Sequence, residues 1–452
     1  MRFTGFDELL SHWARKAPDR PALVYERGGQ PTVCTFSELQ ERVLARANEL
    51  GREPGLCRGV VCDGSFDCVI EIFATVVFGK RLVLLSENAS DAALVDMVKE
   101  ADIASLWGDP DLVDDLTPYL NPKAEGGPGR VLFFTSGTTS RSKAVVLTSA
   151  SLMSSAYNGS ALLPLQPEDR LLCMLPLDHV FGFVCGLLWG LSCGASVALG
   201  RGARHYLDDC AFFQPTALSA VPMLLGFLLQ HQALNEGLKL ILVGAGGCPK
   251  PLLDAARAMG KAVHFGYGLT ETSSGVALSL GSDPYAMTVC PDDTVDIAPD
   301  GEVLISAPTC VMQGYWRRPE DTRAALRGGV LHTGDLGRLD WAGRLILTGR
   351  KKEMLVLMDG TKLFLPEYEG AIARALGTPD LCVVLEDRGP LLVIEGPAQE
   401  KGPLWEKLKP VMAQLPRGQQ LRGMEFYGGP LPRTASGKIM RWAVQREGKE
   451  EK

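Results

Sequence analysis

The residues best suited to chemistry gather in a loop at 135–143, Thr-Ser-Gly-Thr-Thr-Ser-Arg-Ser-Lys, between the apolar runs VLFF and AVVL. The loop combines hydroxyl groups, a glycine and one ammonium group. Hydroxyls, freely placed backbone N–H groups and a lysine are the groups that bind a polyphosphate. The loop is not a Walker loop, because the pattern G-x-x-x-x-G-K-[ST] is absent. Taken alone, such a stretch is usually just a surface loop, so its meaning depends on the rest of the chain.

Two further segments carry matching chemistry. The segment 265–273, Phe-Gly-Tyr-Gly-Leu-Thr-Glu-Thr-Ser, follows an apolar run. In it Tyr267 is suited to stacking on a base, Thr270 to contacting a phosphate, and Glu271 to holding Mg²⁺ while phosphate oxygens supply other ligands. Further along, His-Thr-Gly-Asp ends at Asp335, and we expect a tight turn that presents this carboxylate to two ribose hydroxyls.

These motifs resemble, in wording and order, the successive signatures of one superfamily. The matching segments are FFTSGTTSRSK, GYGLTET, HTGDLGRLD, GRKKEMLVLMDGTKLFLPEYE and PRTASGK. They are similar to the signatures of AMP-forming acyl-CoA synthetases, peptide-synthetase adenylation domains and luciferases. The resemblance extends from about Phe6 to the C-terminus, and the fourth segment is closest in wording to bacterial long-chain acyl-CoA synthetases.

The resemblance implies a reaction in two steps. A carboxylate attacks the α-phosphate of ATP to give an acyl-adenylate and pyrophosphate, and a thiol then displaces AMP to form a thioester. ATP, Mg²⁺ and CoA as the acceptor are therefore expected. Two alternatives stay open: the acyl group passes to a phosphopantetheine carrier protein, or the chain is a nucleotide-binding relative that has lost catalysis.

The resemblance also implies roles for individual residues. The triphosphate is expected to contact Thr135, Ser136, Gly137, Thr138, Thr139 and Lys143. The rest of the nucleotide and thiol set is expected to be Gly246, Gly247, Tyr267, Gly268, Asp335, Arg350 and Gly360. The catalytic set is expected to be His179, Thr270, Glu271 and Lys438. Within these sets Glu271 is the Mg²⁺ carboxylate, Asp335 and Arg350 contact the ribose, and Lys438 bridges carboxylate and phosphate during adenylation.

Some positions depart from the family pattern. The phosphate loop normally has Gly, Pro and Gly where this chain has Ser140, Ser142 and Ala144, so the loop is expected to bend differently. Asp178 stands before His179, where the family usually has an aromatic residue. His179 resembles a residue near the acyl carboxylate and the thiol entrance, and a satisfied core histidine is an equally good interpretation.

The acyl substrate is weakly specified. In the family the acyl pocket is lined by the helix after His179, by a loop matching 244–249, and by residues near Gly268. Apolar side chains after His179 disfavour an amino acid, so we expect a fatty or aryl carboxylate.

The elements that must position these residues follow an α/β pattern, with short apolar runs between amphipathic stretches. At 452 residues the chain exceeds the size of one hydrophobic core, so at least two domains are expected. We predict a large N-terminal domain at 1–351 with α/β subdomains and a β-rich subdomain at about 279–347. A small mobile α+β domain is predicted at 352–452, swinging about Lys352.

Several elements are specific enough to predict by position. Thr35 and Glu38 have capping-box spacing and predict a helix that begins after Thr35. Strands are expected at 60–62, 82–85, 131–134, 171–175, 240–243 and 263–265. The Gly-Pro-rich stretch at 121–129 is interpreted as a surface loop inside a domain.

Composition argues against several classes of protein. The net charge of −7 comes without any extended basic stripe, which argues against nucleic acid as a partner. Twelve cysteines without a C-x-x-C pair indicate free thiols in a reducing cytoplasm. The uncharged stretch 180–200 is long enough to raise the question of a membrane helix, but a turn at Gly194 favours a buried helix and a short strand, with glycines that allow close packing beside a ligand tunnel.

Overall fold

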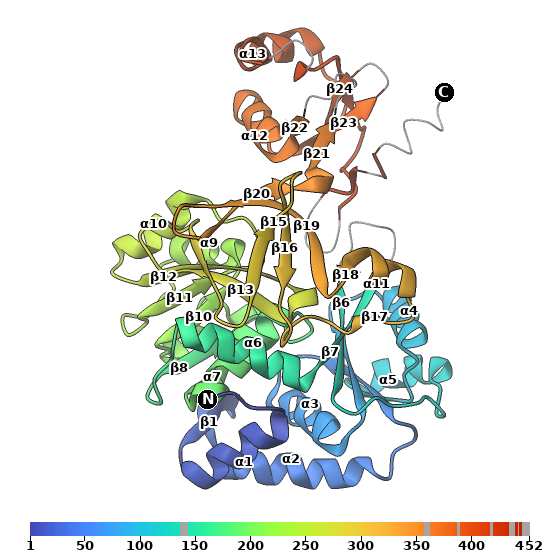
Figure 1. The fold of residues 1–452 in the computed structure, drawn as a ribbon, viewed down its shortest axis with the longest axis vertical. Helices are drawn as coiled ribbons and strands as arrows, with labels where there is room; N and C mark the ends of the chain where they lie inside the picture. The colour runs from blue at the N-terminus through green and yellow to red at the C-terminus, as the bar shows by residue number, and fades with distance from the viewer. Residues whose placement is uncertain are drawn as a thin grey trace.

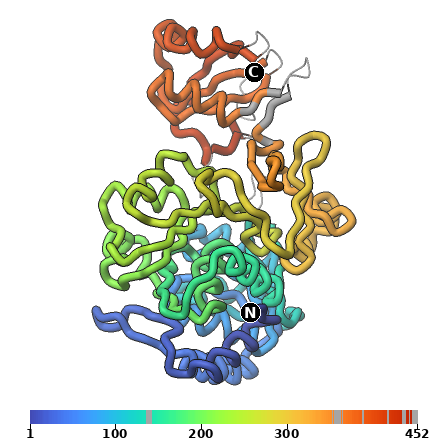
Figure 2. Tube along the Cα trace, turned by 60° about the vertical axis from the view of Figure 1, so that its left-hand side comes forward, coloured from blue at the N-terminus to red at the C-terminus, as the bar shows by residue number. Residues whose placement is uncertain are grey.

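The computed structural model describes residues 1–135, 143–356, 362–386, 389–415, 419–433, 439–441 and 443–444. A large N-terminal part carries two sheets, and a smaller C-terminal part lies beyond one end of it (Figure 1). Figure 2 shows the same two parts from another side, with the C-terminal part joined to the larger one over a narrow region. The predicted mixed α/β fold with a large first part and a small second part is confirmed.

The first sheet has the order β17-β7-β6-β4-β3-β5. Its strands are β3 (Cys57–Cys62), β4 (Arg81–Ser86), β5 (Ser105–Trp107), β6 (Arg130–Thr135), β7 (Lys143–Thr148) and β17 (Gly314–Tyr315). The helices in this region are α3 (Phe66–Phe78), α4 (Asp91–Ala101), α5 (Pro110–Leu116) and the short η1 (Thr117–Tyr119). β6 and β7 form an antiparallel hairpin in which Thr135 pairs with Lys143. The hairpin therefore brings both ends of the phosphate-loop motif together.

The second sheet follows the order β15-β16-β19-β20-β14-β13-β12-β11-β10-β8-β9-β1-β2, with β18 paired to β19. Its first group of strands is β1 (Pro21–Arg27), β2 (Gln30–Thr35), β8 (Arg170–Cys173), β9 (Ser196–Leu199), β10 (Ala217–Ala220), β11 (Leu240–Val243) and β12 (Ala262–Leu269). The β-rich group is β13 (Ser274–Ser279), β14 (Met287–Val289), β15 (Thr294–Ile297), β16 (Glu302–Ser306), β18 (Leu326–Arg327), β19 (Val330–Leu339) and β20 (Leu345–Arg350). β12 pairs in parallel with β11 and antiparallel with β13, so it joins the two groups.

The remaining helices of the N-terminal part cover these sheets. They are α1 (Phe6–Lys16), α2 (Phe36–Leu50), α6 (Ser149–Leu162), η2 (Gly182–Leu188), α7 (Trp189–Cys193), η3 (Ala203–His205), α8 (Asp209–Phe213), α9 (Pro222–Gln230), α10 (Lys250–Ala258), η4 (Thr270–Thr272) and α11 (Pro319–Ala325). The predicted capping box at α2 is present, with Thr35 and Glu38 each bonding the other's backbone N–H.

The uncharged stretch folds inside the protein. It forms the π-helix η2, then α7, a left-handed turn at Gly194 and the buried strand β9. Its glycines sit where a side chain would collide: a Cβ on Gly182 would lie 2.2 Å from the Pro176 carbonyl oxygen, and one on Gly190 would lie 2.6 Å from Val197. Close packing therefore explains the glycines, as predicted. Within the described residues, no helix is long and apolar enough to cross a membrane.

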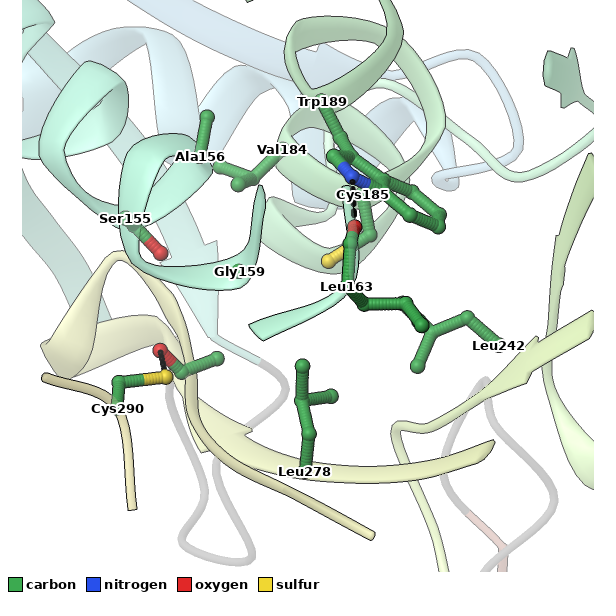
Figure 3. A pocket seen from close by; sticks show the side chains of 11 residues that line it. Ser155, Ala156, Gly159, Leu163, Val184, Cys185, Trp189, Leu242, Leu278 and Cys290 are labelled. Atoms are coloured by element: carbon green, nitrogen blue, oxygen red, sulfur yellow. Dashed lines mark hydrogen bonds between the residues drawn. The ribbon is translucent and has the colours of Figure 1, made fainter. Parts of the chain in front are cut away.

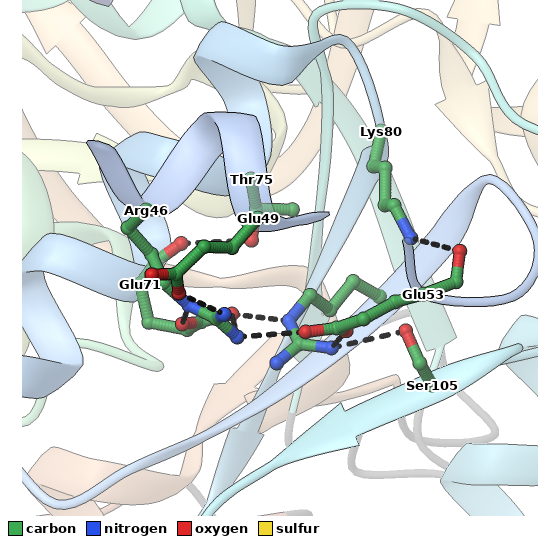
Figure 4. Close-up of polar contacts among 8 residues, drawn as sticks. Arg46, Glu49, Glu53, Glu71, Thr75, Lys80 and Ser105 are labelled. Atoms are coloured by element: carbon green, nitrogen blue, oxygen red, sulfur yellow. Dashed lines mark hydrogen bonds and ion pairs between the residues drawn. The ribbon is translucent and has the colours of Figure 1, made fainter. Parts of the chain in front are cut away.

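A buried ion network ties α2 and α3 to β3 (Figure 4). Arg46 on α2 donates to Glu71 on α3 over 2.6 Å and to Glu53 over 2.8 Å. Arg58 on β3 is 3% exposed and pairs with both Glu71 and Glu53. Glu71 is itself only 2% exposed, and it neutralises the buried guanidinium group of Arg58 and the partly exposed one of Arg46.

The C-terminal part has its own small core. It contains η5 (Lys351–Glu353), β21 (Met354–Val356), β22 (Lys362–Phe364), α12 (Leu365–Leu376), β23 (Leu381–Glu386), β24 (Gly389–Ile394), α13 (Lys401–Ala413) and β25 (Gly423–Phe426). Leu365, Ile372 and Leu408 pack in a cluster separate from that of the larger part. The predicted α+β pattern is confirmed, while the boundary at 351 and 352 stays a prediction.

Most predicted strands are present, with two corrections. The run 171–175 is a strand only to Cys173. The expected tight turn at His332–Asp335 is wrong, because these residues lie within β19, where Gly334 has a φ of 71° and a bulge follows between Leu336 and Gly337. The positive φ that would suit a turn at Gly334 is therefore accommodated inside a strand. The twelve cysteines are free, as predicted.

Candidate active site

Three predicted site residues from three separate motifs, on β12, β19 and β20, meet around one carboxylate. The Tyr267 hydroxyl donates to Asp335 Oδ2 over 2.7 Å, and Arg350 Nε pairs with Asp335 Oδ1 at 2.7 Å. The strand register itself places Asp335 opposite Arg350. Asp335 is 3% exposed, so its charge is balanced by Arg350, whose side chain remains about half exposed.

Tyr267 is held as a hydrogen-bond donor. Burial, reinforced by the neighbouring Asp335 carboxylate, raises the pKa of Tyr267 above its ordinary value. The phenol therefore stays protonated and fixes one oxygen of the carboxylate. The predicted stacking of its ring on a base stays a prediction.

A second cluster of site residues lies beside the hairpin of β6 and β7. The Tyr315 hydroxyl donates to Glu271 Oε1 over 2.7 Å, and burial followed by the Glu271 charge raises the pKa of Tyr315. The Lys143 ammonium lies 4.9 Å from the centre of the Tyr315 ring and 2.9 Å from Asp321 Oδ1. The carboxylate predicted for Mg²⁺ and the lysine predicted for the triphosphate are therefore joined through one aromatic side chain.

The predicted site residues at the end of β12 and just after it lie in irregular backbone. Thr270 and Glu271 form η4 directly after β12, and the backbone oxygen of Glu271 accepts a hydrogen bond from Met312 N over 2.8 Å. Gly268 has no room for a side chain, because a Cβ there would lie 1.8 Å from the backbone oxygen of Ser274. Ser274 itself has a φ of 103°, a strained value for a non-glycine residue.

Gly246 and Gly247 lie in the loop after β11, and no described atom lies within 4 Å of a Cβ built on either. They thus leave open space beside the end of the strand. His179 is not a core histidine: its side chain is 60% exposed, with Nε2 4.0 Å from the buried Asp178 carboxylate. That alternative interpretation is wrong, and the role of His179 near the carboxylate and the thiol stays a prediction.

Several predicted residues fall outside the described residues. These are Ser136, Gly137, Thr138, Thr139, Gly360 and Lys438. Of the phosphate loop, Thr135 and Lys143 are placed, and Thr135 Oγ1 donates to the backbone oxygen of Lys143 over 3.3 Å.

Sequence reasoning missed three residues that hold the site together. Tyr315 and Asp321 contact Glu271 and Lys143 as described. Glu302 accepts hydrogen bonds from Lys351 over 2.7 Å and from the backbone of Gly334 over 2.9 Å, which fixes the strand segment before Asp335. None of the three lies in a motif. Tyr315 and Glu302 lie on strands and Asp321 lies on α11, each far along the chain from its partner, so no local signal marked them.

The residues fit a Mg²⁺ ion that is shared with a phosphorylated substrate. Among the described residues, no group of three or more His, Cys, Asp or Glu side chains could hold a metal ion alone. Mg²⁺ usually takes one or two protein carboxylates and completes its shell with phosphate oxygens and water. Glu271 has a carboxylate of this kind, and its role as the Mg²⁺ ligand stays a prediction.

Comparison with known proteins shows the family to which the chain belongs. A sequence model described as AMP-binding enzyme matches residues 118–316. A 2-succinylbenzoate–CoA ligase of Bacillus velezensis is 30% identical over 403 residues, covering 79% of this chain and 80% of that protein. The corresponding ligase of Bacillus cereus is 29% identical over 408 residues, covering 80% and 82%.

Solved structures agree on the fold. The O-succinylbenzoate coenzyme A synthetase of Bacillus subtilis, in complex with AMP, aligns with a TM-score of 0.82 at 23% identity over 97% of this chain and 98% of that chain. The anthranilate CoA ligase AuaEII, in complex with anthranoyl-AMP, aligns with a TM-score of 0.80 at 19% identity, covering 99% and 97%. The chain therefore belongs to the AMP-binding enzyme family, and its resemblance to AMP-forming acid–thiol ligases is confirmed.

Proposed function

We propose that this protein joins a carboxylic acid to coenzyme A through an acyl-adenylate. In the first step a carboxylate oxygen attacks the α-phosphorus of ATP, and pyrophosphate leaves. In the second step the thiol sulfur attacks the acyl carbonyl carbon, AMP leaves, and the thiol proton is released. In-line displacement at phosphorus needs mainly positioning and charge neutralisation.

The observation that carries this proposal is the joining of Tyr267, Asp335 and Arg350. These residues come from three motifs, yet they form one hydrogen-bonded unit around a buried carboxylate. A carboxylate held in place by two partners offers fixed acceptor oxygens to ribose hydroxyls. We assign Asp335 and Arg350 to the ribose, with Tyr267 and Gly268 beside the adenine.

The phosphate end is assigned to the hairpin and to η4. Thr135 and Lys143, with Ser136, Gly137, Thr138 and Thr139 between them, would wrap the triphosphate. Thr270 contacts the same phosphates, and Glu271 would hold Mg²⁺, which neutralises phosphate charge when bound. Lys143 must leave Asp321 to reach a phosphate, and the hydrogen bond from Tyr315 keeps Glu271 in place while it does so.

The C-terminal part supplies the remaining groups. We place a domain boundary between residues 351 and 352 and a hinge at Lys352. One orientation brings Lys438 to the carboxylate and the α-phosphate for adenylation. The other brings Gly360 to the thiol path, with His179 at its entrance. Rigid domains that alternate between two closed states separate the two half-reactions.

The relatives favour an aryl acid over a fatty acid. The curated relatives described above are named as ligases of 2-succinylbenzoate, and one structural neighbour is named for anthranilate. These names give no support to the suggested closeness to long-chain acyl-CoA synthetases or to a role in fatty-acid metabolism. The same names support CoA as the acceptor. Twelve free thiols support a reducing compartment, and we propose the cytoplasm.

Trapping with hydroxylamine tests the proposal without knowledge of the acceptor. Purified protein, ATP, Mg²⁺ and a panel of carboxylic acids should give acid-dependent hydroxamate and pyrophosphate. Addition of CoA in place of hydroxylamine should give acyl-CoA and AMP. ATP binding without acid-dependent pyrophosphate release would instead identify a nucleotide-binding protein without this activity. Adenylate that transfers only to a carrier protein would exclude CoA.

A further inference from the structure

Two hollows in the molecule differ in what they can hold. The first, drawn in Figure 3, lies between Ser155 on α6, Cys185 on η2 and Leu278 on β13 and has about 30 Å³ of usable space. That is room for about one or two water molecules. The second, which we call the β17 hollow, has about 370 Å³ and is within the size range of small-molecule sites. The β17 hollow is therefore the better candidate for a ligand.

The β17 hollow lies where β17, at the edge of the first sheet, meets α11 (Figure 1). Its walls come from the start of β6, from β7, from the segment 313–317 and from α11. The strand register places Gly314 opposite Val146. The Thr322 hydroxyl on α11 accepts a hydrogen bond from the backbone N–H of Tyr315 over 2.9 Å, and a Cβ on Gly314 would lie 2.8 Å from the Thr322 side chain. Strand pairing and close packing therefore fix the walls relative to one another.

The walls of the β17 hollow are positively charged, although the whole chain is acidic. Three of the ten lining residues are arginines, Arg130, Arg317 and Arg323, and none is Asp or Glu. Arg317 pairs at 3.0 Å with Asp102, which does not line the hollow. Arg130 Nε donates to the neutral side chain of Gln313 over 3.1 Å, and neither Arg130 nor Arg323 pairs with a carboxylate among the described residues. Two unbalanced guanidinium groups thus favour an anion in this space.

The groups that the hollow leaves for a ligand are mainly hydrogen-bond donors. The side-chain hydroxyls of Tyr315 and Thr322 already donate to other groups of the protein. The side-chain oxygen of Gln313 accepts from Arg130. The guanidinium N–H groups stay available, and their planar fork matches the oxygens of phosphate. A ligand with acceptor oxygens and more than one negative charge suits this arrangement, and an inorganic oligophosphate has both.

Tyr315 connects the hollow to the phosphate end of the candidate active site. It lines the hollow, its hydroxyl donates to Glu271, and its ring lies 4.9 Å from the Lys143 ammonium. Lys143 in turn pairs at 2.9 Å with Asp321, the residue before Thr322, so the charge of this neighbouring acid is offset. A phosphate anion that is released at this end therefore has the hollow one side chain away.

We propose that the β17 hollow binds the inorganic pyrophosphate that the first half-reaction releases, with Arg130, Arg317 and Arg323 as the binding residues. The inference rests on the proposed function, which supplies the pyrophosphate. No covalent bond changes in this step: the anion passes from the phosphate loop to the arginines, and Lys143 pairs again with Asp321. The hollow thereby separates pyrophosphate from the acyl-adenylate, which it would otherwise attack in the reverse reaction.

Isothermal titration calorimetry of the whole chain with inorganic pyrophosphate and Mg²⁺ tests the inference. The nucleotide site is first saturated with α,β-methylene-ATP, in which the bridge between the α- and β-phosphates cannot be cleaved. We expect pyrophosphate to bind under these conditions, and Arg323→Gln to weaken that binding about 5- to 20-fold, because a charge-assisted contact is lost. Pyrophosphate that binds only when the analogue is absent would lie in the nucleotide site, and the inference would be wrong.

Arg327→Gln is the matched control. Arg327 is exposed like Arg323 and lies just after α11, on β18, but it does not line the hollow. Its substitution should leave the affinity for pyrophosphate unchanged. Because Arg323 is exposed and has no ion-pair partner among the described residues, Arg323→Gln should fold, and thermal unfolding checks this. Equal affinities of both variants and the unchanged protein would overturn the inference.

Coenzyme A also carries phosphate groups, so the same proteins are titrated with CoA. If Arg323→Gln weakens the binding of CoA and leaves that of pyrophosphate unchanged, the hollow serves the thiol substrate and the inference is wrong. Failure of the proposed function appears in a different measurement, as the absence of acid-dependent pyrophosphate release with every acid. That result would remove the source of pyrophosphate and overturn both, whereas a failed titration with normal pyrophosphate release would overturn the inference alone.

Discussion

At the scale of single residues, Asp335 is the most informative position. Its two oxygens are held by Tyr267 and Arg350, and it is almost fully buried. Asp335→Asn keeps the shape but removes the charge. Because hydrogen bonds to a charged group contribute about 1.5–3 kcal/mol, we expect the KM for ATP to rise about 10- to 100-fold.

Steady-state adenylation at varied ATP measures this effect. Asp296→Asn, an exposed position on β15 in the same sheet, is the control and should leave the KM for ATP unchanged. Equal KM values for Asp335→Asn and the unchanged protein would show that this carboxylate does not contact the nucleotide.

Asp293 provides a second residue-scale prediction, through pH. Burial raises the pKa of this carboxyl to about 7, well above the value of about 3.9 expected in the unfolded chain. Between these values the folded state binds more protons, so the free energy of unfolding falls as the pH rises from about 4 to about 7 and is constant above.

Asp293→Asn removes the titrating carboxyl group, and with it the fall in the free energy of unfolding as the pH rises. The variant should gain stability relative to the unchanged protein as the pH is raised from 5 to 8, by at most about 3 kcal/mol. Thermal unfolding at both pH values measures the difference. A difference that does not depend on pH would show that Asp293 titrates normally.

Much of the site was predictable at this scale, because motif residues carry their chemistry in their type and order. Tyr267, Asp335 and Arg350 were all marked by their motifs, although the sequence could not show that the three form one unit, and their roles toward the nucleotide stay predictions. Tyr315, Asp321 and Glu302 were not predictable, since their partners lie 44, 178 and 49 positions away and the contacts depend on tertiary packing.

At the scale of elements, the ion network between α2, α3 and β3 should dominate local stability. Removal of one partner from a buried ion pair typically costs about 3–5 kcal/mol, because the other charge stays buried without a partner. Glu71→Ala removes the one fully buried carboxylate that Arg46 and Arg58 share and leaves both with the more exposed Glu53. We therefore expect a large fall in the free energy of unfolding, measured by thermal or denaturant melts.

Glu49→Ala is the matched control. Glu49 also pairs with Arg46, at 3.0 Å, but its side chain is 62% exposed. Exposed pairs contribute about 0–1 kcal/mol, so this change should be nearly neutral. Equal effects of the two substitutions would mean that the network contributes no more than a surface ion pair does.

Elements were easier to predict by type than by local shape. The capping box at α2 and the strands at 82–85, 131–134 and 240–243 follow from short-range chemistry. The π-helical form of η2 did not, because it depends on packing of Gly182 against the backbone at Pro176 and on a hydrogen bond from Ser219 to the Cys185 carbonyl. The segment at His332–Asp335 was mistaken for a turn because Gly334 is a turn residue in most contexts.

At the scale of the whole molecule, the small C-terminal part has a core of its own beside the larger part. We predict that Lys438→Ala lowers adenylation at least about 100-fold yet leaves thioester formation from supplied acyl-adenylate within about threefold, because the two half-reactions use different closed states. Single-turnover measurements of each half-reaction check this. A parallel loss of both would count against alternation of the C-terminal part.

Transfer of oxygen from the acid to AMP tests the central claim most directly. An acid labelled with ¹⁸O in its carboxylate is turned over with ATP, Mg²⁺ and CoA, and the products are analysed by mass spectrometry. The account predicts one ¹⁸O atom in AMP and none in pyrophosphate, because the carboxylate oxygen attacks the α-phosphorus. Labelled inorganic phosphate together with ADP, or AMP without label, would contradict it.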